Sequence, residues 1–251
     1  HLKNRLKYVS GGKTGFILGV GAPGFQSKEA RSIVSQVLPQ IDLITVRDEW
    51  SKRNIESVCD NVDVTVTACP VFLFEDPKVA STGKTGINFR PYFREKEDMS
   101  KQELKTHFDY EDTQGATTAY IENAQQICEN IDDPIFIPFT PKDEYFARKY
   151  LNIPTYNYKF SVKKTLRRVS RTERMVATRY HSLIFAALCG KPTLAIAYEP
   201  KVQQVAERLD IPSYKPHKDI PVQFSKPSNR SQLQNSARQN FDLLFNNLRN
   251  K

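Results

Sequence analysis

The strongest constraint on the fold is a repeated alternation of short apolar segments with longer amphipathic ones. Residues 15–20 are Gly-Phe-Ile-Leu-Gly-Val, which has the length and composition of a buried strand. From Ser27 to Leu38 the apolar residues instead recur every three or four positions, which is the spacing of one helix face. The alternation continues along most of the chain, and it predicts βαβ units with parallel sheets covered by helices on both faces.

The chain is long enough for two domains, and one polar segment separates them. Its 251 residues exceed the usual size of a single domain, and residues 74–83 are rich in charged residues, proline, serine and glycine, which is typical of a linker. We expect an α/β domain at residues 1–82 and a second at residues 83–251, closed by a helix over about 231–249. The second domain has about six predicted βα units, one of them with a strand at 155–158, whereas the first is short.

Polar residues mark where several predicted helices begin. Ser27 and Ser51 precede helical segments, and their hydroxyls can accept hydrogen bonds from unpaired backbone N–H groups. Thr140 stands before Pro141, and proline fits the first helical position because it has no N–H group there to leave unpaired. We therefore expect helix N-caps at Ser27, Ser51 and Thr140.

Charge and cysteine content narrow the function classes. The 37 Lys and Arg residues against 28 Asp and Glu give a net charge of +9 and a pI near 9.3, which favours anionic partners: nucleic acid, phosphorylated metabolites or a membrane surface. A mean hydropathy of −0.54, without an apolar run of ~18–20 residues, predicts no transmembrane helix. The cysteines show no CxxC or Cys/His pairing, so we expect no zinc site, no disulfide framework and a cytoplasmic location. They are Cys59, Cys69, Cys128 and Cys189.

A glycine-rich turn follows the first predicted strand. Residues 19–24, Gly-Val-Gly-Ala-Pro-Gly, match the GxGxxG pattern of dinucleotide sites, and Asp48 follows where a ribose-binding acid would stand. In such sites the helix begins among the glycines, whereas Pro23 and Ser27 delay it here. We therefore prefer a tight turn at the edge of a cleft, with Gly21 as a candidate ligand contact, and rank a dehydrogenase last.

Charged residues gather where predicted strands end, which is where ligands bind in open α/β sheets. A guanidinium and an imidazole together at a helix N-terminus can bind an oxyanion and transfer a proton. The structural alternatives are a solvated ion pair for Arg47 and Asp48, and a helix-capping or carbonyl-bonded imidazole for His181. The strand-end candidates are Arg47-Asp48, Arg90, Arg179-Tyr180-His181 and Tyr198-Glu199-Pro200-Lys201.

A basic run follows in the predicted helix 161–171. Its i, i+3 and i, i+4 spacing places much of the charge on one exposed face, and the ordinary interpretation is a solvated surface. No nucleic-acid-binding motif accompanies it, so we do not expect nucleic acid as a partner and prefer a lipid phosphate or a membrane face. The run consists of Lys163, Lys164, Arg167, Arg168, Arg171 and Arg174.

Taken together, these motifs resemble the polysaccharide pyruvyl transferase family in order and spacing, from Gly19 to about Leu209. The resemblance includes Asp42–Glu49 with Ser51, then Gly-Ile-Asn-Phe-Arg-Pro at 86–91. Its most specific part is the series R-x-H, helix, G-x-P, strand, Y-x-x-K, which runs from Arg179 to Lys201. The resemblance implies a glycosyltransferase-B-like (GT-B) fold of two Rossmann-like domains, and transfer of a pyruvyl group from phosphoenolpyruvate to two sugar hydroxyls as a cyclic ketal.

The sequence departs from the family pattern in two places. The family usually has a Gly-Asn-x-Gly-Asp-like loop after its first strand, and no such motif precedes Gly19. Together with a first residue that is not Met, this leads us to expect that part of the first domain lies upstream of this chain. Where relatives tend to carry Asp-Pro after the third strand, this chain has Cys69-Pro70.

The resemblance and the demands of ketal transfer imply a role for each candidate. C3 of the donor must receive a proton, and His181 is the candidate acid because histidine titrates near neutral pH. Arg179 is expected to orient the donor beside it. A carboxylate should take the sugar's hydroxyl proton: either Glu199, or Asp48, whose alternative role is to hold Arg47. No metal or redox cofactor is implied. The other candidates for binding substrate are Arg47, Arg90, Tyr198, Lys201 and Gly21.

Two alternatives stay open at this stage. A nucleotide-sugar glycosyltransferase of the same fold would use Glu199 for ribose and Lys201 for the diphosphate. A non-catalytic descendant would bind a glycan or a phosphorylated ligand without phosphate release. The expected partners are phosphoenolpyruvate and a sugar or lipid-linked oligosaccharide of a cell-envelope glycan, while peripheral membrane contact and a homo-oligomer are open.

Overall fold

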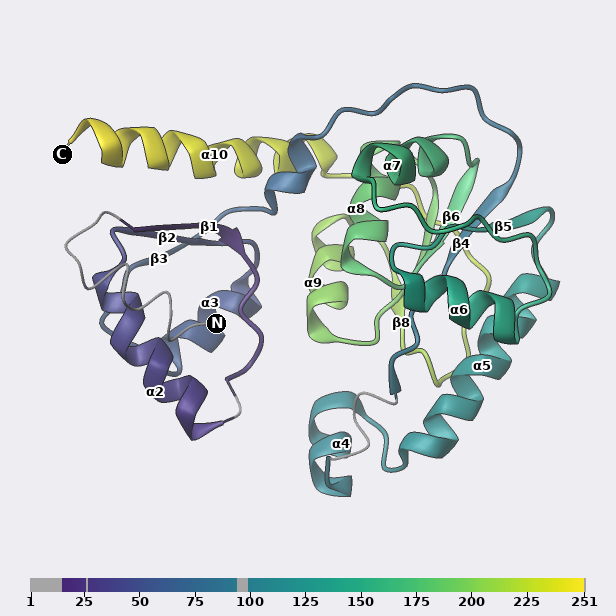
Figure 1. The fold of residues 1–251 in the computed structure, drawn as a ribbon, viewed down its shortest axis with the longest axis horizontal. Helices are drawn as coiled ribbons and strands as arrows, with labels where there is room; N and C mark the ends of the chain where they lie inside the picture. The colour runs from purple at the N-terminus through teal and green to yellow at the C-terminus, as the bar shows by residue number, and fades with distance from the viewer. Residues whose placement is uncertain (1–14, 26, 94–98, 251) are drawn as a thin grey trace. The chain divides into compact units, whose positions relative to one another are not determined.

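A computed structural model describes residues 15–25, 27–93 and 99–250 (Figure 1). The chain divides into two compact units, one of residues 1–73 with 231–251 and one of residues 74–230. In the described part of the chain, every helix is too short or too polar to cross a bilayer.

The first unit contains a parallel sheet of three strands in the order β1-β2-β3. Buried side chains of β2, β3 and the helices form its core, including Val34, Ile44, Val46, Ile55 and Val64. The strand and helix alternation predicted from the sequence is therefore present. The elements are β1 (Phe16–Val20), α2 (Lys28–Val37), η1 (Leu38–Gln40), β2 (Leu43–Val46), α3 (Glu49–Glu56), β3 (Val64–Val66), η2 (Pro70–Leu73) and α10 (Arg230–Arg249).

Of the two helix N-caps predicted in this unit, the structure confirms Ser27 and contradicts Ser51. The Ser27 hydroxyl accepts a hydrogen bond from the Ala30 N–H at 3.1 Å, so α2 begins as expected. The cap of α3 is Asp48, not Ser51: its Oδ1 accepts from the Ser51 N–H at 2.7 Å. The helix starts earlier than predicted because Asp48, extended at the end of β2, reaches the first free N–H groups. The Ser51 hydroxyl instead accepts from the Ala22 N–H at 3.0 Å.

The C-terminal helix α10 belongs to the first unit, and our expectation that it closes the second domain is wrong. The boundaries lie after Leu73 and after Arg230. The fully buried Asn240 explains the assignment, because its side chain ties α10 to the first sheet. Its Oδ1 accepts hydrogen bonds from the hydroxyls of Thr45 and Thr67, the latter at 2.8 Å, and its Nδ2 donates to the Ala68 carbonyl at 3.0 Å.

The second unit contains a parallel sheet of five strands in the order β5-β4-β6-β7-β8, with helices around it (Figure 1). The middle strands are almost wholly buried, and so is the apolar helix α8. The strands are β4 (Thr85–Asn88), β5 (Pro134–Phe136), β6 (Arg174–Ala177), β7 (Thr193–Ile196) and β8 (Ser213–Tyr214). The helices are α4 (Lys101–Phe108), α5 (Thr113–Glu129), α6 (Pro141–Tyr150), α7 (Val162–Ser170), α8 (Tyr180–Leu188) and α9 (Pro200–Arg208).

One predicted strand of this unit is absent. Residues 155–158 make only an isolated bridge between Thr155 and Phe136, so the stretch is not a strand. Arg168 holds this segment instead, donating to the Asn157 carbonyl at 2.8 Å with its guanidinium 4.5 Å from the Tyr156 ring centroid. The stretch predicted as a strand is thus a loop held to α7 by Arg168.

Candidate active site

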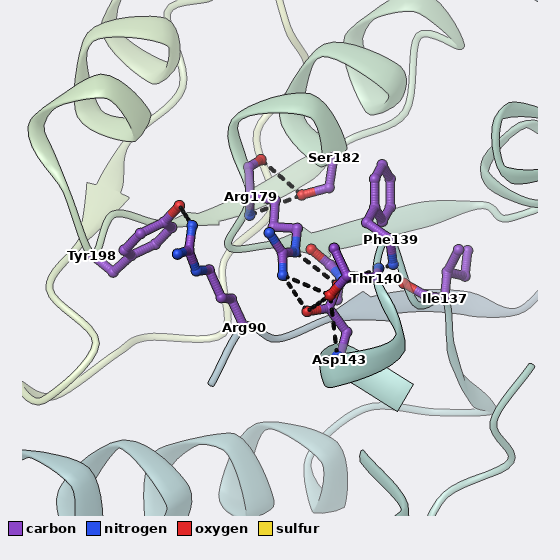
Figure 2. A network of polar contacts seen from close by, with 9 residues as sticks. Arg90, Ile137, Phe139, Thr140, Asp143, Arg179, Ser182 and Tyr198 are labelled. Atoms are coloured by element: carbon purple, nitrogen blue, oxygen red, sulfur yellow. Dashed lines mark hydrogen bonds and ion pairs between the residues drawn. The ribbon is translucent and has the colours of Figure 1, made fainter. Parts of the chain in front are cut away.

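The strand order of the second unit gathers the predicted strand-end residues at one edge. Strands β5, β4, β6 and β7 are neighbours and all parallel, so their carboxyl ends lie together. The residues after these strands are Thr140, Arg90, Arg179 and Tyr198 in that spatial order, and Figure 2 shows their side chains. This is the edge where open α/β sheets bind ligands.

At the centre of this edge, the Arg179 guanidinium is held by a buried carboxylate. Its Nε donates to Asp143 Oδ2 at 2.7 Å, and its Nη2 donates to Asp143 Oδ1 and to the Thr140 hydroxyl (Figure 2). The Asp143 side chain is fully buried and also accepts from the backbone N–H groups of Phe139 and Thr140 at 3.0 and 3.1 Å. Such a two-pronged pair fixes the arginine in one orientation. Within the described residues, Nη1 of Arg179 meets no hydrogen-bond acceptor.

Sequence reasoning missed Asp143 as a member of the site. It identified the helix start correctly: Thr140 caps α6 with Pro141 in the first turn, and Asp143 completes a capping box. The Thr-Pro-x-Asp pattern could have marked Asp143 as a helix-capping residue. No local signal pairs it with Arg179, which lies 36 residues away.

Arg90 and Tyr198 form a second pair on the neighbouring strands. Arg90 Nη1 donates to the Tyr198 hydroxyl at 2.8 Å, and the guanidinium lies 5.0 Å from the ring centroid (Figure 2). Burial, and then the charge of Glu199, raise the pKa of Tyr198 to about 12. The phenol therefore keeps its proton at neutral pH, and no acceptor for that proton lies among the described residues. The pair thus combines a cation with an O–H donor.

Glu199 and Lys201 flank the start of α9. Pro200 occupies the first turn of this helix, as the sequence predicted, and the Lys201 ammonium pairs with the Glu199 carboxylate. The ammonium also lies 5.5 Å from the Tyr198 ring centroid. Both charged side chains are partly exposed. Lys201 is therefore placed beside Tyr198, but part of its charge is compensated by Glu199.

His181 is an exposed residue in the first turn of α8. Its ring meets the Tyr180 ring edge-on, with centroids 5.3 Å apart. The buried Ser182 makes the capping contacts: its hydroxyl accepts from the Arg179 N–H at 3.0 Å and donates to the Arg179 carbonyl at 2.8 Å. Ser182 therefore supplies these capping contacts, and His181 lies two residues after Arg179 at the N-terminus of α8.

The strand-end residues of the first unit form a separate, local group. Arg47 Nε lies 3.4 Å from Asp48 Oδ2, and both side chains are largely buried. A Cβ atom on Gly21 would lie 2.4 Å from Arg47 Cζ, so the glycine makes room for the guanidinium. Asp48 is thus engaged in capping α3 and in holding Arg47, the structural alternative weighed from the sequence. Gly21 contacts Arg47 in the same group.

Close packing explains the first two glycines of the pattern, Gly19 and Gly21. Gly19 has a φ of +56°, and a Cβ there would lie 2.6 Å from Pro70. Gly24 has open space around its Cα, and α2 begins only at Lys28. Since no helix N-terminus lies among the glycines, the turn lacks the anion-binding feature of a dinucleotide site.

An apolar pocket of about 440 Å³ is lined by residues that flank the strand-end edge. Tyr92 and Phe93 follow β4, and Pro141 and Phe146 belong to α6. Its mostly aromatic lining suits an apolar group rather than a carboxylate or phosphate. Across the described ranges, no cluster of three or more His, Cys, Asp or Glu side chains is arranged to hold a metal ion.

Comparison with solved structures gives the class of fold. A UDP-forming α,α-trehalose-phosphate synthase from Burkholderia xenovorans matches with a TM-score of 0.51 at 11% identity, over 96% of this chain and 69% of that one. TarM matches with a TM-score of 0.45 at 17% identity, over 94% of this chain and 44% of its own, so the chain spans less than half the length of TarM. The two α/β units have the GT-B class of fold, as predicted.

The family follows from a second comparison. The model of the polysaccharide pyruvyl transferase family matches residues 3–200, and the chain belongs to this family. This match confirms the resemblance seen in the strand-end motifs. A comparison with curated proteins gives no match.

Proposed function

We propose that this protein transfers a pyruvyl group from phosphoenolpyruvate to two hydroxyls of a sugar, forming a cyclic ketal and releasing phosphate. The observation that carries the proposal is the strand-end edge of the second unit, where Asp143 fixes Arg179, two residues before His181, with Arg90 and Tyr198 after neighbouring strands. This set offers cations for a donor with a carboxylate and a phosphate, and an imidazole for proton transfer.

The reaction balances without an oxidant or a metal ion. Protonation of C3 turns the enol carbon C2 into an electrophile, which one sugar hydroxyl oxygen attacks. Phosphate leaves from C2, and the second hydroxyl oxygen closes the ketal. One proton ends on C3 as part of the new methyl group, and the other leaves with the phosphate as HPO₄²⁻. The site must therefore supply a proton at C3, accept protons from the hydroxyls and bind anions throughout.

His181 is the proposed general acid for C3. It stands in the first turn of α8, two residues after the arginine that we assign to the donor. Since Asp143 and Thr140 occupy the Nε and Nη2 groups of Arg179, its Nη1 is the group proposed to meet the donor. Fixing the arginine in advance lowers the entropy cost of orienting the substrate.

Arg90, Tyr198 and Lys201 are the proposed partners of the departing phosphate and the donor carboxylate. The Tyr198 O–H supplies a neutral donor alongside the Arg90 guanidinium, and both belong to strand ends adjacent to Arg179. Arg47, in the first unit, is a separate candidate for donor binding, and a variant at this position would test it.

Glu199 is the proposed base for the sugar hydroxyl. It is partly exposed, whereas Asp48 is 2% exposed and already bound to a helix N-terminus and to Arg47. We therefore prefer Glu199 to Asp48 for proton transfer, with Lys201 positioned to stabilise the charge of its carboxylate.

A nucleotide-sugar glycosyltransferase is the second candidate, and the likeness to a UDP-forming synthase of the same fold favours it. If this chain were such a glycosyltransferase, Glu199 would bind ribose and Lys201 would bind the diphosphate. In this structure the two side chains pair with each other. A non-catalytic binding protein is the third candidate.

The test is phosphate release from phosphoenolpyruvate with a panel of β-galactoside and N-acetylmannosamine-type acceptors. We expect acceptor-dependent release that falls about 10²–10⁴-fold in His181→Ala. The matched control is His217→Ala, since this histidine belongs to the same unit and contacts the Asp109 carbonyl. Calorimetric titration with phosphoenolpyruvate alone measures donor binding in each variant.

The other outcomes separate the candidates. Donor binding without release under any acceptor would favour the non-catalytic protein. Binding of a nucleotide diphosphate without binding of phosphoenolpyruvate would favour the glycosyltransferase. Equal loss in His181→Ala and His217→Ala would remove His181 from its proposed role.

The cytoplasm is the proposed compartment of the reaction. No disulfide joins the cysteines of the described residues, and all four are buried, which suits a reducing environment. They are Cys59, Cys69, Cys128 and Cys189.

A further inference from the structure

The start of α7 carries an apolar tip that the fold leaves in water. Phe160 is 97% exposed and Val162 is 54% exposed, and they stand on either side of the helix-capping Ser161. A phenylalanine this exposed contributes nothing to the core. Single exposed apolar residues are ordinary, but two such side chains at one tip are a candidate contact surface.

A ring of cations surrounds this tip. Residues 156–172 contain six Lys and Arg and no Asp or Glu. Those nearest Phe160 are exposed, and we name the whole surface the Phe160 patch. The patch consists of Lys159, Phe160, Val162, Lys163, Lys164 and Arg167.

The fold holds this patch outward. Helix α7 buries Thr165, Leu166 and Val169, whereas its two lysines are exposed. The preceding loop is tied to the helix by Arg168, which donates to the Asn157 carbonyl at 2.8 Å and does not belong to the exposed set. The tip is thus presented by a packed helix and an anchored loop.

The acidic group that contacts the loop before the patch is already engaged elsewhere. Glu144 on α6 accepts a hydrogen bond from the Tyr158 N–H at 2.6 Å and pairs with Arg148 at 2.9 Å. Its charge is therefore already compensated, and these contacts keep the pKa of Glu144 below its usual value.

We propose that the Phe160 patch docks the protein on a membrane surface that carries anionic lipids. Phe160 and Val162 would enter the interface between headgroups and acyl chains, while the surrounding lysines contact lipid phosphates. Nucleic acid would match the charge, but an exposed valine has no face on which a base can stack. The combination of an apolar tip with a basic ring therefore favours lipid. The inference does not rest on the proposed reaction, because binding is measured without either substrate.

The test is co-sedimentation of the whole chain with phosphatidylcholine vesicles that contain or lack 30% phosphatidylglycerol. We expect binding to the anionic vesicles that weakens as salt is raised. The double variant Lys163→Glu/Lys164→Glu should bind at least about 25-fold more weakly, or roughly fivefold for each lysine removed. The control Lys215→Glu/Lys226→Glu changes two exposed lysines elsewhere in the same unit and should bind like the parent.

A second pair of variants tests the apolar tip. Phe160→Ser should weaken binding to the anionic vesicles several-fold without changing its salt dependence. Its control is Phe245→Ser, which removes a 55% exposed phenylalanine of α10. Circular dichroism shows whether each variant keeps its fold.

Three results would overturn the proposal. One is absence of binding to anionic vesicles by the parent chain, and another is equal weakening in the patch and control variants. The third is Phe160-dependent binding to single-stranded nucleic acid in place of vesicles, which would assign the patch to that partner.

Discussion

Two arginine–aspartate pairs stand at strand ends, one in each unit, and they are built differently. Arg47 and Asp48 are consecutive residues after β2, with a single contact of 3.4 Å. Arg179 follows β6, and its partner Asp143 comes from α6, joined by a two-pronged contact and by backbone donors. The local pair needs only one loop to form, whereas the remote pair needs the sheet to be assembled. The comparison indicates that the remote pair has the larger effect on stability.

The largest expected effect is on the remote pair. Asp143→Ala leaves the Arg179 guanidinium without its counter-ion and removes the capping box of α6, so we expect the free energy of unfolding to fall by about 3–5 kcal/mol. Urea unfolding followed by circular dichroism measures it. The matched control is Asp133→Asn, which removes the charge of an exposed ion pair with Lys84, suits the positive φ of this position and should have little effect.

A smaller effect is expected where Arg47 packs against the backbone. In Gly21→Ala the new methyl would overlap the guanidinium, the flexible end of Arg47, so we expect a displaced Arg47 and a loss of about 1–2 kcal/mol. Gly24→Ala meets no atom within 4 Å and should stay within about 0.5 kcal/mol of the parent. Fluorescence of Trp50, on α3, reports unfolding of this unit. Equal stability of the two variants would contradict the packing argument.

Removal of the local aspartate should cost less than removal of the remote one. Asp48→Ala loses the N-cap of α3 and the contact with Arg47, and we expect about 0.5–2 kcal/mol. The same Trp50 signal measures the change, and Asp48→Ser, which keeps a capping oxygen, should recover most of it. A loss as large as that of Asp143→Ala would break the comparison between the two pairs.

The smallest effect concerns a third aspartate, in the linker segment of the second unit. Burial would raise the pKa of Asp76, but hydrogen bonds from the Ser170 hydroxyl at 2.6 Å and from the Lys78 N–H at 3.0 Å outweigh it and lower the pKa below its usual value. Its ionised form therefore stabilises the folded state above the ordinary carboxyl pKa of ~3.9, and this is lost as pH falls below that value. We expect Asp76→Asn to cost under about 1 kcal/mol at pH 7.

The measurement is urea unfolding of parent and Asp76→Asn between pH 7 and pH 3. The difference between them should shrink as the pH falls toward the acid limit. A difference that stays constant with pH would show that the carboxylate charge has no part in holding the linker.

Much of the site was predictable because local sequence patterns mark its residues. Thr140 with Pro141 marks the start of α6, and the strand-end positions of Arg90, Arg179 and Tyr198 follow from apolar runs that stop at a charged or polar residue. Such signals act within about one helical turn, so they can be read without knowing the fold. The prediction of Ser51 as a cap was wrong even though capping is local. Asp48 stands one turn earlier and competes for the same N–H groups.

The sequence by itself determined the parallel α/β architecture, the helix and strand periods and the identity of the strand-end cations. Only the tertiary structure decided that Asp143 holds Arg179 and that Asn240 joins α10 to the first sheet. The physical reason is the range of the interactions. Periodicity and capping depend on neighbours in the chain, whereas these pairings depend on strand order and on which buried polar atoms need partners after the sheets form.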